Sequence, residues 1–108
     1  MRRNKFGAKP ITIDGHRFPS LKEGRRYSEL KILLQAGKIS DMVLQPKYPL
    51  LVNGRVCGNY FADFRYFDLV RCREVVEDVK GGKATQTQVS KLKIKLVHAI
   101  HGIEVVIV

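Results

Sequence analysis

The fold is decided by residues 60–80, which read YFADFRYFDLVRCREVVEDVK. Two β-prone stretches, Tyr60–Asp68 and Arg73–Lys80, are separated by a few residues, a pattern typical of two antiparallel strands joined by a tight turn. A turn around residues 69–71 predicts a register in which Asp63 lies opposite Asp78, because the midpoint of the two positions falls inside that turn. The hairpin is therefore expected to bring two carboxylates together.

Two carboxylates on facing strands predict that a cation binds between them. Directly opposed side chains have Cβ atoms about 4.5–5.5 Å apart, and like charges there destabilise the sheet. A divalent cation between Asp63 and Asp78 would offset the repulsion, and oxygen ligands suit Mg²⁺ or Mn²⁺. A slip of one residue in the register would instead move one acid to the other face of the sheet.

The segment Asp78-Val79-Lys80 adds an amine to this face. Side chains alternate along a strand, so Asp78 and Lys80 lie on one side, about 7 Å apart. A metal ion lowers the pKa of water, and Lys80 would then orient the nucleophile or neutralise phosphate charge. The pattern therefore predicts metal-assisted phosphodiester hydrolysis.

Glu23 has two interpretations. Ser20-Leu21-Lys22-Glu23 is a capping-box sequence, with Ser20 as the N-cap of a helix expected to run to about Ala36. An acid in the first helical turn lies near the positive end of the helix dipole and can also reach a metal between helix and sheet. The two roles do not exclude each other.

The flanking segments predict an α+β (α/β) fold with a mixed central β-sheet and two flanking helices. Asp14-Gly15 between two short β-prone runs predicts a hairpin at residues 11–18. We expect a single domain, residues 1–108, in which residues 1–9 form a basic N-terminal arm. The apolar final strand is expected to be covered on both faces. The other expected elements are strands at Ile39–Leu44 and Tyr48–Val52, a helix at Thr87–His101 and the final strand at Ile103–Val108.

The charge balance points to a polyanionic partner. Twenty Lys and Arg residues oppose ten Asp and Glu residues, giving a formal net charge of +10. Such a field attracts nucleic acid and makes its binding salt-dependent. Basic side chains gather on both predicted helices, so we expect phosphate contacts from Lys22, Arg25, Arg26, Lys91 and Lys95.

Cysteine usage and hydropathy restrict the class of protein. Two cysteines, Cys57 and Cys72, cannot build a disulfide framework or a four-thiolate zinc site, so we expect free thiols in a reducing cytoplasm. No apolar run approaches the ~20 residues of a membrane span, and the first residues lack a signal sequence. Secretion and membrane spanning are therefore not expected.

The chain resembles a family of small phage and prophage proteins in the PD-(D/E)XK nuclease superfamily. The shared order is a Glu on the first helix, an Asp on a strand, Asp-x-Lys on the next strand and a helix after it. The resemblance implies a restriction-endonuclease-like core with the order α-β-β-β-α-β. The small size is also similar to that of archaeal-type Holliday-junction resolvases, which are dimers with two active sites. The matching stretches are Asn4–Lys9, Ser20–Tyr27, Glu29–Lys31, Leu44–Pro46, Ala62–Phe64 and Val76–Gly81.

The resemblance also implies roles for individual residues. Asp63, Asp78 and the main-chain carbonyl of Val79 would hold Mg²⁺ or Mn²⁺. Lys80 would assist the nucleophile, and Glu23 would be the helix acid close to the metal. Asp78 stands where Glu is common in the superfamily, and Asp is an accepted alternative.

These observations predict a Mg²⁺-dependent DNA endonuclease of recombination or repair, working as a homodimer in the cytoplasm of a bacterial host. Branched DNA is the expected substrate, because 108 residues leave no room for a separate sequence-reading domain. The alternative is a non-catalytic nucleic-acid-binding module of phage replication or packaging, in which the acids only cap the helix and complete the hairpin. A third possibility, a basic structural protein of an assembly, predicts exposed apolar surface and no acidic centre.

Overall fold

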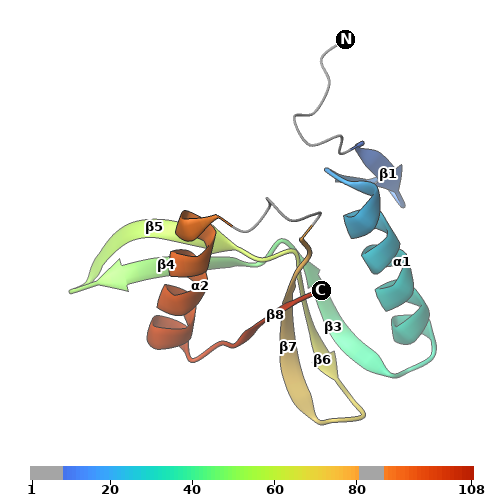
Figure 1. Cartoon of the computed structure of the whole chain (residues 1–108). Helices are drawn as coiled ribbons and strands as arrows, with labels where there is room; N and C mark the ends of the chain where they lie inside the picture. The colour runs from blue at the N-terminus through green and yellow to red at the C-terminus, as the bar shows by residue number, and fades with distance from the viewer. Residues whose placement is uncertain (1–8, 81–86) are drawn as a thin grey trace.

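The computed structural model describes residues 9–80 and 87–108 (Figure 1). Nearly all of the predicted N-terminal arm, residues 1–9, lies outside the described residues. The expected α+β class is confirmed. The elements are β1 Ile11–Ile13, β2 His16–Phe18, α1 Leu21–Gln35, β3 Ile39–Leu44, β4 Lys47–Val52, β5 Arg55–Phe61, β6 Phe64–Asp68, β7 Arg73–Asp78, α2 Gln88–His101 and β8 Val105–Ile107.

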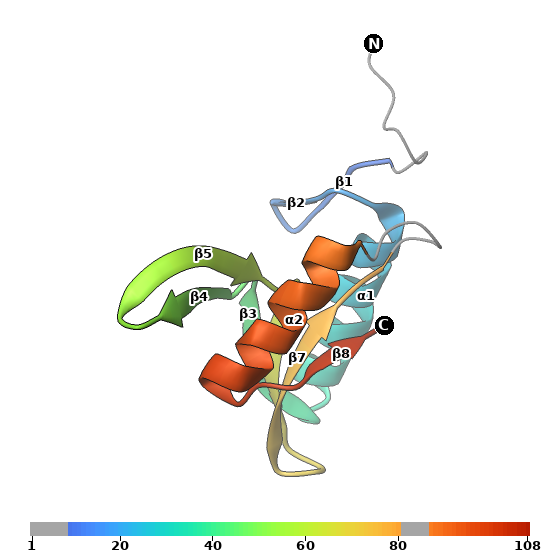
Figure 2. The same ribbon diagram turned by 60° about the vertical axis from the view of Figure 1, so that its left-hand side comes forward.

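A four-stranded mixed sheet in the order β3-β6-β7-β8 forms the centre of the molecule. The pairs β3–β6 and β6–β7 are antiparallel, and β8 runs parallel to β7. Helix α1 covers one face of this sheet and α2 lies against the other (Figure 2). Tyr27 and Leu30 of α1 pack on Phe64 of β6, whereas Val97 of α2 packs with Val76 of β7. The predicted mixed sheet between two helices is therefore confirmed.

The β6–β7 hairpin has the predicted register. Phe64 pairs with Glu77, and Asp68 pairs with Arg73 beside the turn. One step beyond the last ladder pair, the same register would set Asp63 opposite Asp78. The N–H of Asp63 donates to the carbonyl oxygen of Glu77 at 2.9 Å and its Oδ2 accepts from the N–H of Val79 at 2.6 Å, so Asp63 stays beside the end of β7 after the ladder has ended.

The single strand expected at Tyr60–Asp68 is in fact two strands. β5 ends at Phe61 and pairs with β4 in a separate two-stranded ribbon, and β6 begins only at Phe64. Asp63 therefore lies at the crossing between ribbon and sheet, not inside a strand. The predicted strand begins at Tyr60, whereas β5 begins at Arg55. The prediction misses the first part of β5 because Cys57-Gly58-Asn59 interrupts its β-prone pattern.

The N-terminus of α1 is fixed by its cap and by the β1–β2 hairpin. The Oγ of Ser20 accepts a hydrogen bond from the N–H of Glu23 at 3.1 Å, as the capping sequence predicts. A Cβ at Gly24 would lie 2.7 Å from Cγ2 of Ile11, so only glycine lets the hairpin approach the helix this closely. This packing holds the first turn of α1, with Glu23, against the sheet.

Strand β8 brings the end of the chain to the end of β7. The N–H of Val108 donates to the carbonyl of Asp78 at 3.1 Å, and the N–H of Lys80 donates to the carbonyl of Val108 at 3.2 Å. Val106 and Ile107 are each 41% exposed, so the expectation that this strand is covered on both faces is wrong. The physical reason is that β8 is an edge strand of the sheet.

Helix length also bears on membrane association. Neither helix that the structure describes is long and apolar enough to cross a bilayer.

Candidate functional site

Three carboxylates converge where the first turn of α1 meets the ends of β6 and β7. Glu23 is 5% exposed and Asp78 is 7% exposed, while Asp63 is partly buried between them. Asp63 lies close enough to both neighbours for the charges of Glu23 and Asp78 to raise its pKa. The structure thus brings together the facing pair expected from the hairpin and the acid expected from the helix.

Burial and neighbouring acids raise the pKa values of two of these groups, Asp63 and Glu23. Burial, more than any other cause, raises the pKa of Asp63 to about 8, and the charges of Glu23 and Asp78 add to this effect. A hydrogen bond from the N–H of Val79, at 2.6 Å, partly opposes the rise. Burial likewise raises the pKa of Glu23, and Asp78 adds to it. Such a cluster needs a proton or a cation, because buried like charges are unfavourable.

Asp78 is held by two donors from different elements. The hydroxyl of Tyr60 on β5 donates to Oδ2 of Asp78 at 2.6 Å, and Nζ of Lys80 lies 3.1 Å from the same oxygen. Burial and this hydrogen bond raise the pKa of Tyr60, so the phenol stays protonated and keeps donating. Among the described residues, no hydrogen-bond donor contacts Oδ1 of Asp78, which leaves that oxygen available.

Lys80 is fixed in place as well. Besides Asp78, its Nζ donates to Oγ of Ser90, in the first turn of α2, at 3.2 Å. The Lys80 side chain is only 17% exposed. An amine held at two points beside a carboxylate cluster is arranged to meet negative charge on a bound group.

The oxygens of the cluster fit a hard divalent cation. The candidate donors are the carboxylates of Asp63 and Asp78 and the nearby carboxylate of Glu23, to which the resemblance adds the main-chain carbonyl of Val79. Within residues 9–80 and 87–108, no group of three or more His, Cys, Asp or Glu side chains is placed to hold a metal ion by itself. Mg²⁺ ordinarily binds through one or two carboxylates and keeps several waters, so an open donor set of this kind suits it.

The predicted phosphate-binding residues divide into two groups. Lys22 and Arg25 on α1 are exposed, as are Lys91 and Lys95 on α2. Arg26 instead points into the protein, with Nε 2.7 Å from Oε1 and Nη2 2.6 Å from Oε2 of Glu77. The prediction for Arg26 is therefore corrected, because Arg26 lies three residues after Glu23 and turns to the sheet with it.

Sequence reasoning missed two supporting residues, Tyr60 and Ser90. Tyr60 lies 18 residues from Asp78, and Ser90 lies 10 residues from Lys80. No local spacing signals either contact, since each depends on how β5 and α2 pack on the sheet. Lys22 also reaches the site, where its Nζ donates to the main-chain carbonyl of Lys80.

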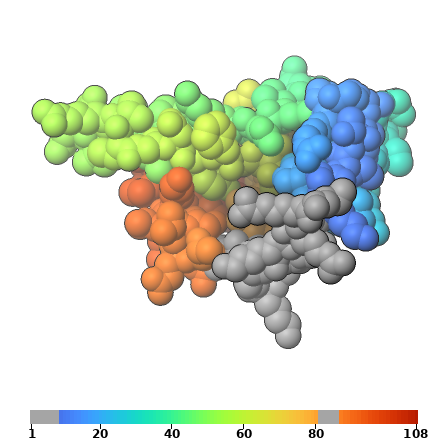
Figure 3. Space-filling view, turned by 90° about the horizontal axis from the view of Figure 1, so that it is seen from above, coloured from blue at the N-terminus to red at the C-terminus, as the bar shows by residue number. Residues whose placement is uncertain are grey.

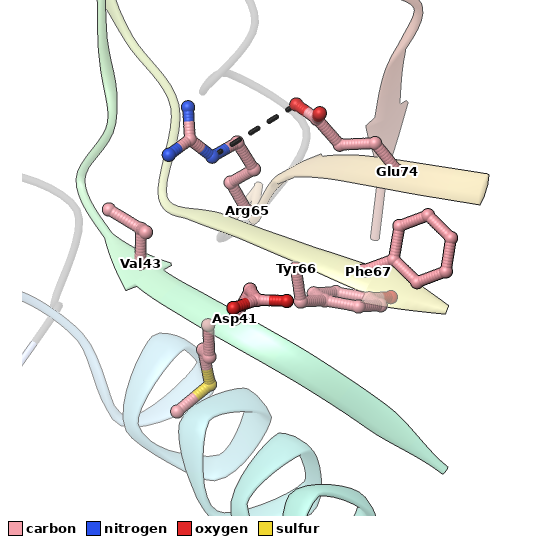
Figure 4. A pocket seen from close by; sticks show the side chains of 7 residues that line it. Asp41, Val43, Arg65, Tyr66, Phe67 and Glu74 are labelled. Atoms are coloured by element: carbon pink, nitrogen blue, oxygen red, sulfur yellow. Dashed lines mark ion pairs between the residues drawn. The ribbon is translucent and has the colours of Figure 1, made fainter. Parts of the chain in front are cut away.

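A separate hollow of about 630 Å³ opens elsewhere on the sheet (Figure 4). Arg65 and Glu74 form an exposed ion pair there, with Nε and Oε1 4.0 Å apart. None of the predicted site residues lines this hollow, so the carboxylate cluster remains the candidate site. The hollow is lined by Asp41, Met42, Val43, Arg65, Tyr66, Phe67 and Glu74.

Comparison with known proteins gives one match. Residues 3–102 match a family model described as "Protein of unknown function (DUF1064)". No curated protein and no solved structure matches the chain. The matched range includes all three carboxylates and Lys80, and since the description names no activity, the function has to be argued from the site.

Proposed function

We propose that the chain, which belongs to the DUF1064 family, is a metal-dependent DNA endonuclease that hydrolyses phosphodiester bonds. The observation that carries this proposal is the convergence of the Asp63, Asp78 and Glu23 carboxylates with the fixed amine of Lys80. Clustering buried acids costs stability, and perturbed groups of this kind gather at functional sites. The non-catalytic alternative requires no such convergence.

Each residue of the cluster has a distinct role in the proposed reaction. Asp63, Asp78 and the Val79 carbonyl would hold Mg²⁺ or Mn²⁺, and Glu23 would stand beside it. When bound, the ion supplies a Lewis acid for the phosphate and lowers the pKa of water. Lys80, positioned by Asp78 and Ser90, stabilises negative charge that develops on the phosphate.

The distribution of positive charge supports DNA as the substrate. The cluster lies between two helices that carry exposed basic side chains, Lys22 and Arg25 on α1 and Lys91 and Lys95 on α2. These residues would contact phosphates on both sides of the cleaved bond. Together with the resemblance to small phage and prophage nucleases, this favours branched DNA in a bacterial host as the setting.

The proposal is tested by comparing substrates under one set of conditions. Four-way junctions, flaps, linear duplex and single strands are incubated with protein and Mg²⁺ or Mn²⁺, with EDTA as the control. We expect metal-dependent cleavage that is fastest on the four-way junction. Salt-dependent binding without cleavage of any substrate would contradict the nuclease and leave the non-catalytic binding module.

A homodimer is part of the same proposal. Resolving a junction requires two symmetric cuts, and a two-fold dimer supplies two sites that mirror the substrate's symmetry. We expect sedimentation at micromolar concentration to show two chains bound to one junction. A protein that stays monomeric with the junction, and nicks linear duplex equally fast, would keep its nuclease chemistry but lose the resolvase assignment.

Glu23→Gln separates metal binding from helix capping. We expect the Mg²⁺ concentration for half-maximal cleavage to rise about tenfold, because a charged neighbour of the ion is lost. The melting temperature of the metal-free protein should not fall, since the cap uses the main-chain N–H of residue 23 and a buried carboxyl beside Asp78 is lost. Glu29→Gln, an exposed acid on the same helix, is the matched control. A normal metal titration for Glu23→Gln would return Glu23 to a structural role.

A further inference from the structure

The β4–β5 ribbon and helix α2 form a lobe without acidic residues. Residues 47–61 and 88–101, which form these elements, contain no Asp or Glu, although the chain has ten such residues. The ribbon and the helix pack on each other, with Val97 of α2 in one core with Tyr48, Leu50 and Tyr60 of the ribbon. The charged Lys and Arg residues of the lobe are Lys47, Arg55, Lys91, Lys93 and Lys95.

The ribbon projects from the body of the molecule. It shares no ladder with the central sheet, and Figure 3 shows it, in green, extending away from α1 with α2, in orange, beside it. Its strands of six and seven residues span about 20 Å, which equals about six base pairs of duplex. At the tip, a turn of Asn53 and Gly54 with positive φ angles joins the strands.

One face of the ribbon has no partner in the described chain. Tyr48 and Tyr60 point to α2 and are buried, whereas apolar side chains elsewhere on the ribbon are open to solvent. Val56 is 59% exposed, and Phe61, at the base next to the carboxylate site, is 57% exposed. Leu51 pairs with Val56 and lies on the same face, whereas Val52 pairs with Arg55 at the tip and is exposed on the other face.

We infer that the β4–β5 ribbon lies in a groove of the double-stranded DNA next to the cleaved bond, an inference that rests on the proposed endonuclease function. The major groove is about 12 Å wide and admits a two-stranded β-ribbon. The exposed apolar side chains would contact base edges such as the thymine methyl group, and Arg55 at the tip would contact phosphate or base. The substrate therefore includes a duplex segment beside the scissile phosphate.

Hydrogen bonds connect the ribbon to the carboxylate site and to α2. Tyr60 at its base donates to Asp78, and Nζ of Lys93 on α2 donates to the carbonyl of Asn59 at 3.2 Å. A duplex seated on the ribbon is thus held in a fixed relation to the carboxylate that would bind metal. This is how a small domain can align its substrate without a second domain.

A second copy of the chain is the other possible occupant of an apolar ribbon. A two-fold interface sets the same surface against itself, so it would bring together two lobes that carry no carboxylate. Lys47 and Arg55 would then face like charges. DNA supplies the negative charge that the lobe lacks, so the charge distribution favours DNA over self-association.

The two free cysteines provide the test in the unmodified protein. Cys57 lies on β5 of the ribbon, Cys72 lies in the β6–β7 turn, and both are exposed. Alkylation of each thiol is followed by mass spectrometry with and without a saturating 20-base-pair duplex, in EDTA to prevent cleavage. We expect DNA to slow alkylation of Cys57 about tenfold and to leave Cys72 unchanged.

The outcomes separate the alternatives. Equal alkylation of Cys57 with and without bound duplex would overturn the inference, and so would protection of Cys57 by higher protein concentration without DNA, which indicates a second copy. Because the assay involves no cleavage, protection of Cys57 in a protein that cuts nothing would refute the nuclease and keep the ribbon as a DNA-binding element.

A pair of matched variants checks the same point through affinity. Arg55→Ala with Val56→Thr removes a cation and an apolar contact from the ribbon tip, and should weaken duplex binding about tenfold or more. Arg71→Ala with Val70→Thr makes the same change at the β6–β7 turn and should leave affinity unchanged. Equal affinities for the two double variants would also overturn the inference.

Discussion

Asp63→Asn and Asp78→Asn should each slow cleavage at least about a hundredfold, because each removes a charged oxygen ligand whose ion supplies several kcal/mol of transition-state stabilisation. DNA binding should persist or tighten, since a negative charge beside the phosphates is lost. Asp63→Asn should also raise the melting temperature of the metal-free protein at neutral pH. With a pKa of about 8, Asp63 has to take up a proton on folding at neutral pH, whereas Asn needs none and its oxygen still accepts from Val79.

The measurements are single-turnover cleavage rates and melting temperatures with and without Mg²⁺. Added Mg²⁺ should raise the melting temperature of the wild type and have little effect on the Asp63→Asn variant. Asp68→Asn is the control in the same hairpin, because Oδ1 of Asp68 accepts from the N–H groups of Val70 and Arg71 in the turn. It should lower stability without slowing cleavage. Full activity of both Asp63→Asn and Asp78→Asn would eliminate this site.

The parts of the fold that sequence predicts well are those with local causes. The Asp14-Gly15 turn, the Ser20 cap and the β6–β7 register follow from short-range backbone geometry, and the structure confirms all three. The break at Ala62-Asp63 has no such local signal. It arises because β5 joins β4 in the ribbon while β6 joins the central sheet, a choice made by tertiary packing.

In the candidate site, too, some contacts follow from local sequence and others depend on tertiary packing. Asp63 and Asp78 lie just beyond and at the end of the β6–β7 ladder, so their proximity follows from the hairpin, and Glu23 joins them because it lies in the first turn of the adjacent helix. Tyr60 comes from the ribbon and Ser90 from α2, so their contacts appear only when the separate elements are assembled.

Arg25 and Arg26 show that a difference of one position on a helix can change the role of a side chain. Both are basic and adjacent, and composition alone assigns them to the same phosphate-binding surface. Successive residues differ by about 100° around a helix, so only one of them can face the sheet. Arg26 faces it and meets Glu77, which is 1% exposed and also accepts from the hydroxyl of Tyr66.

Arg26→Ala should destabilise the fold by about 3–5 kcal/mol, because it leaves the charge of Glu77 buried without its cation. For a domain of this size the melting temperature should fall by at least about 12 °C. Calorimetry or a thermal scan by circular dichroism measures the effect. DNA affinity, measured well below the melting temperature, should be close to that of the wild type.

Arg25→Ala is the matched control, and its expected effects are the opposite. Arg25 is exposed, so its loss should change the free energy of unfolding by no more than about 0.5 kcal/mol. It should weaken DNA binding and reduce the salt dependence, because one phosphate contact is removed. Adding Glu77→Gln to Arg26→Ala should recover part of the lost stability, since the buried charge is then gone while the amide oxygen still accepts from Tyr66. A stable Arg26→Ala variant with weakened DNA binding would instead place Arg26 on the DNA-binding surface.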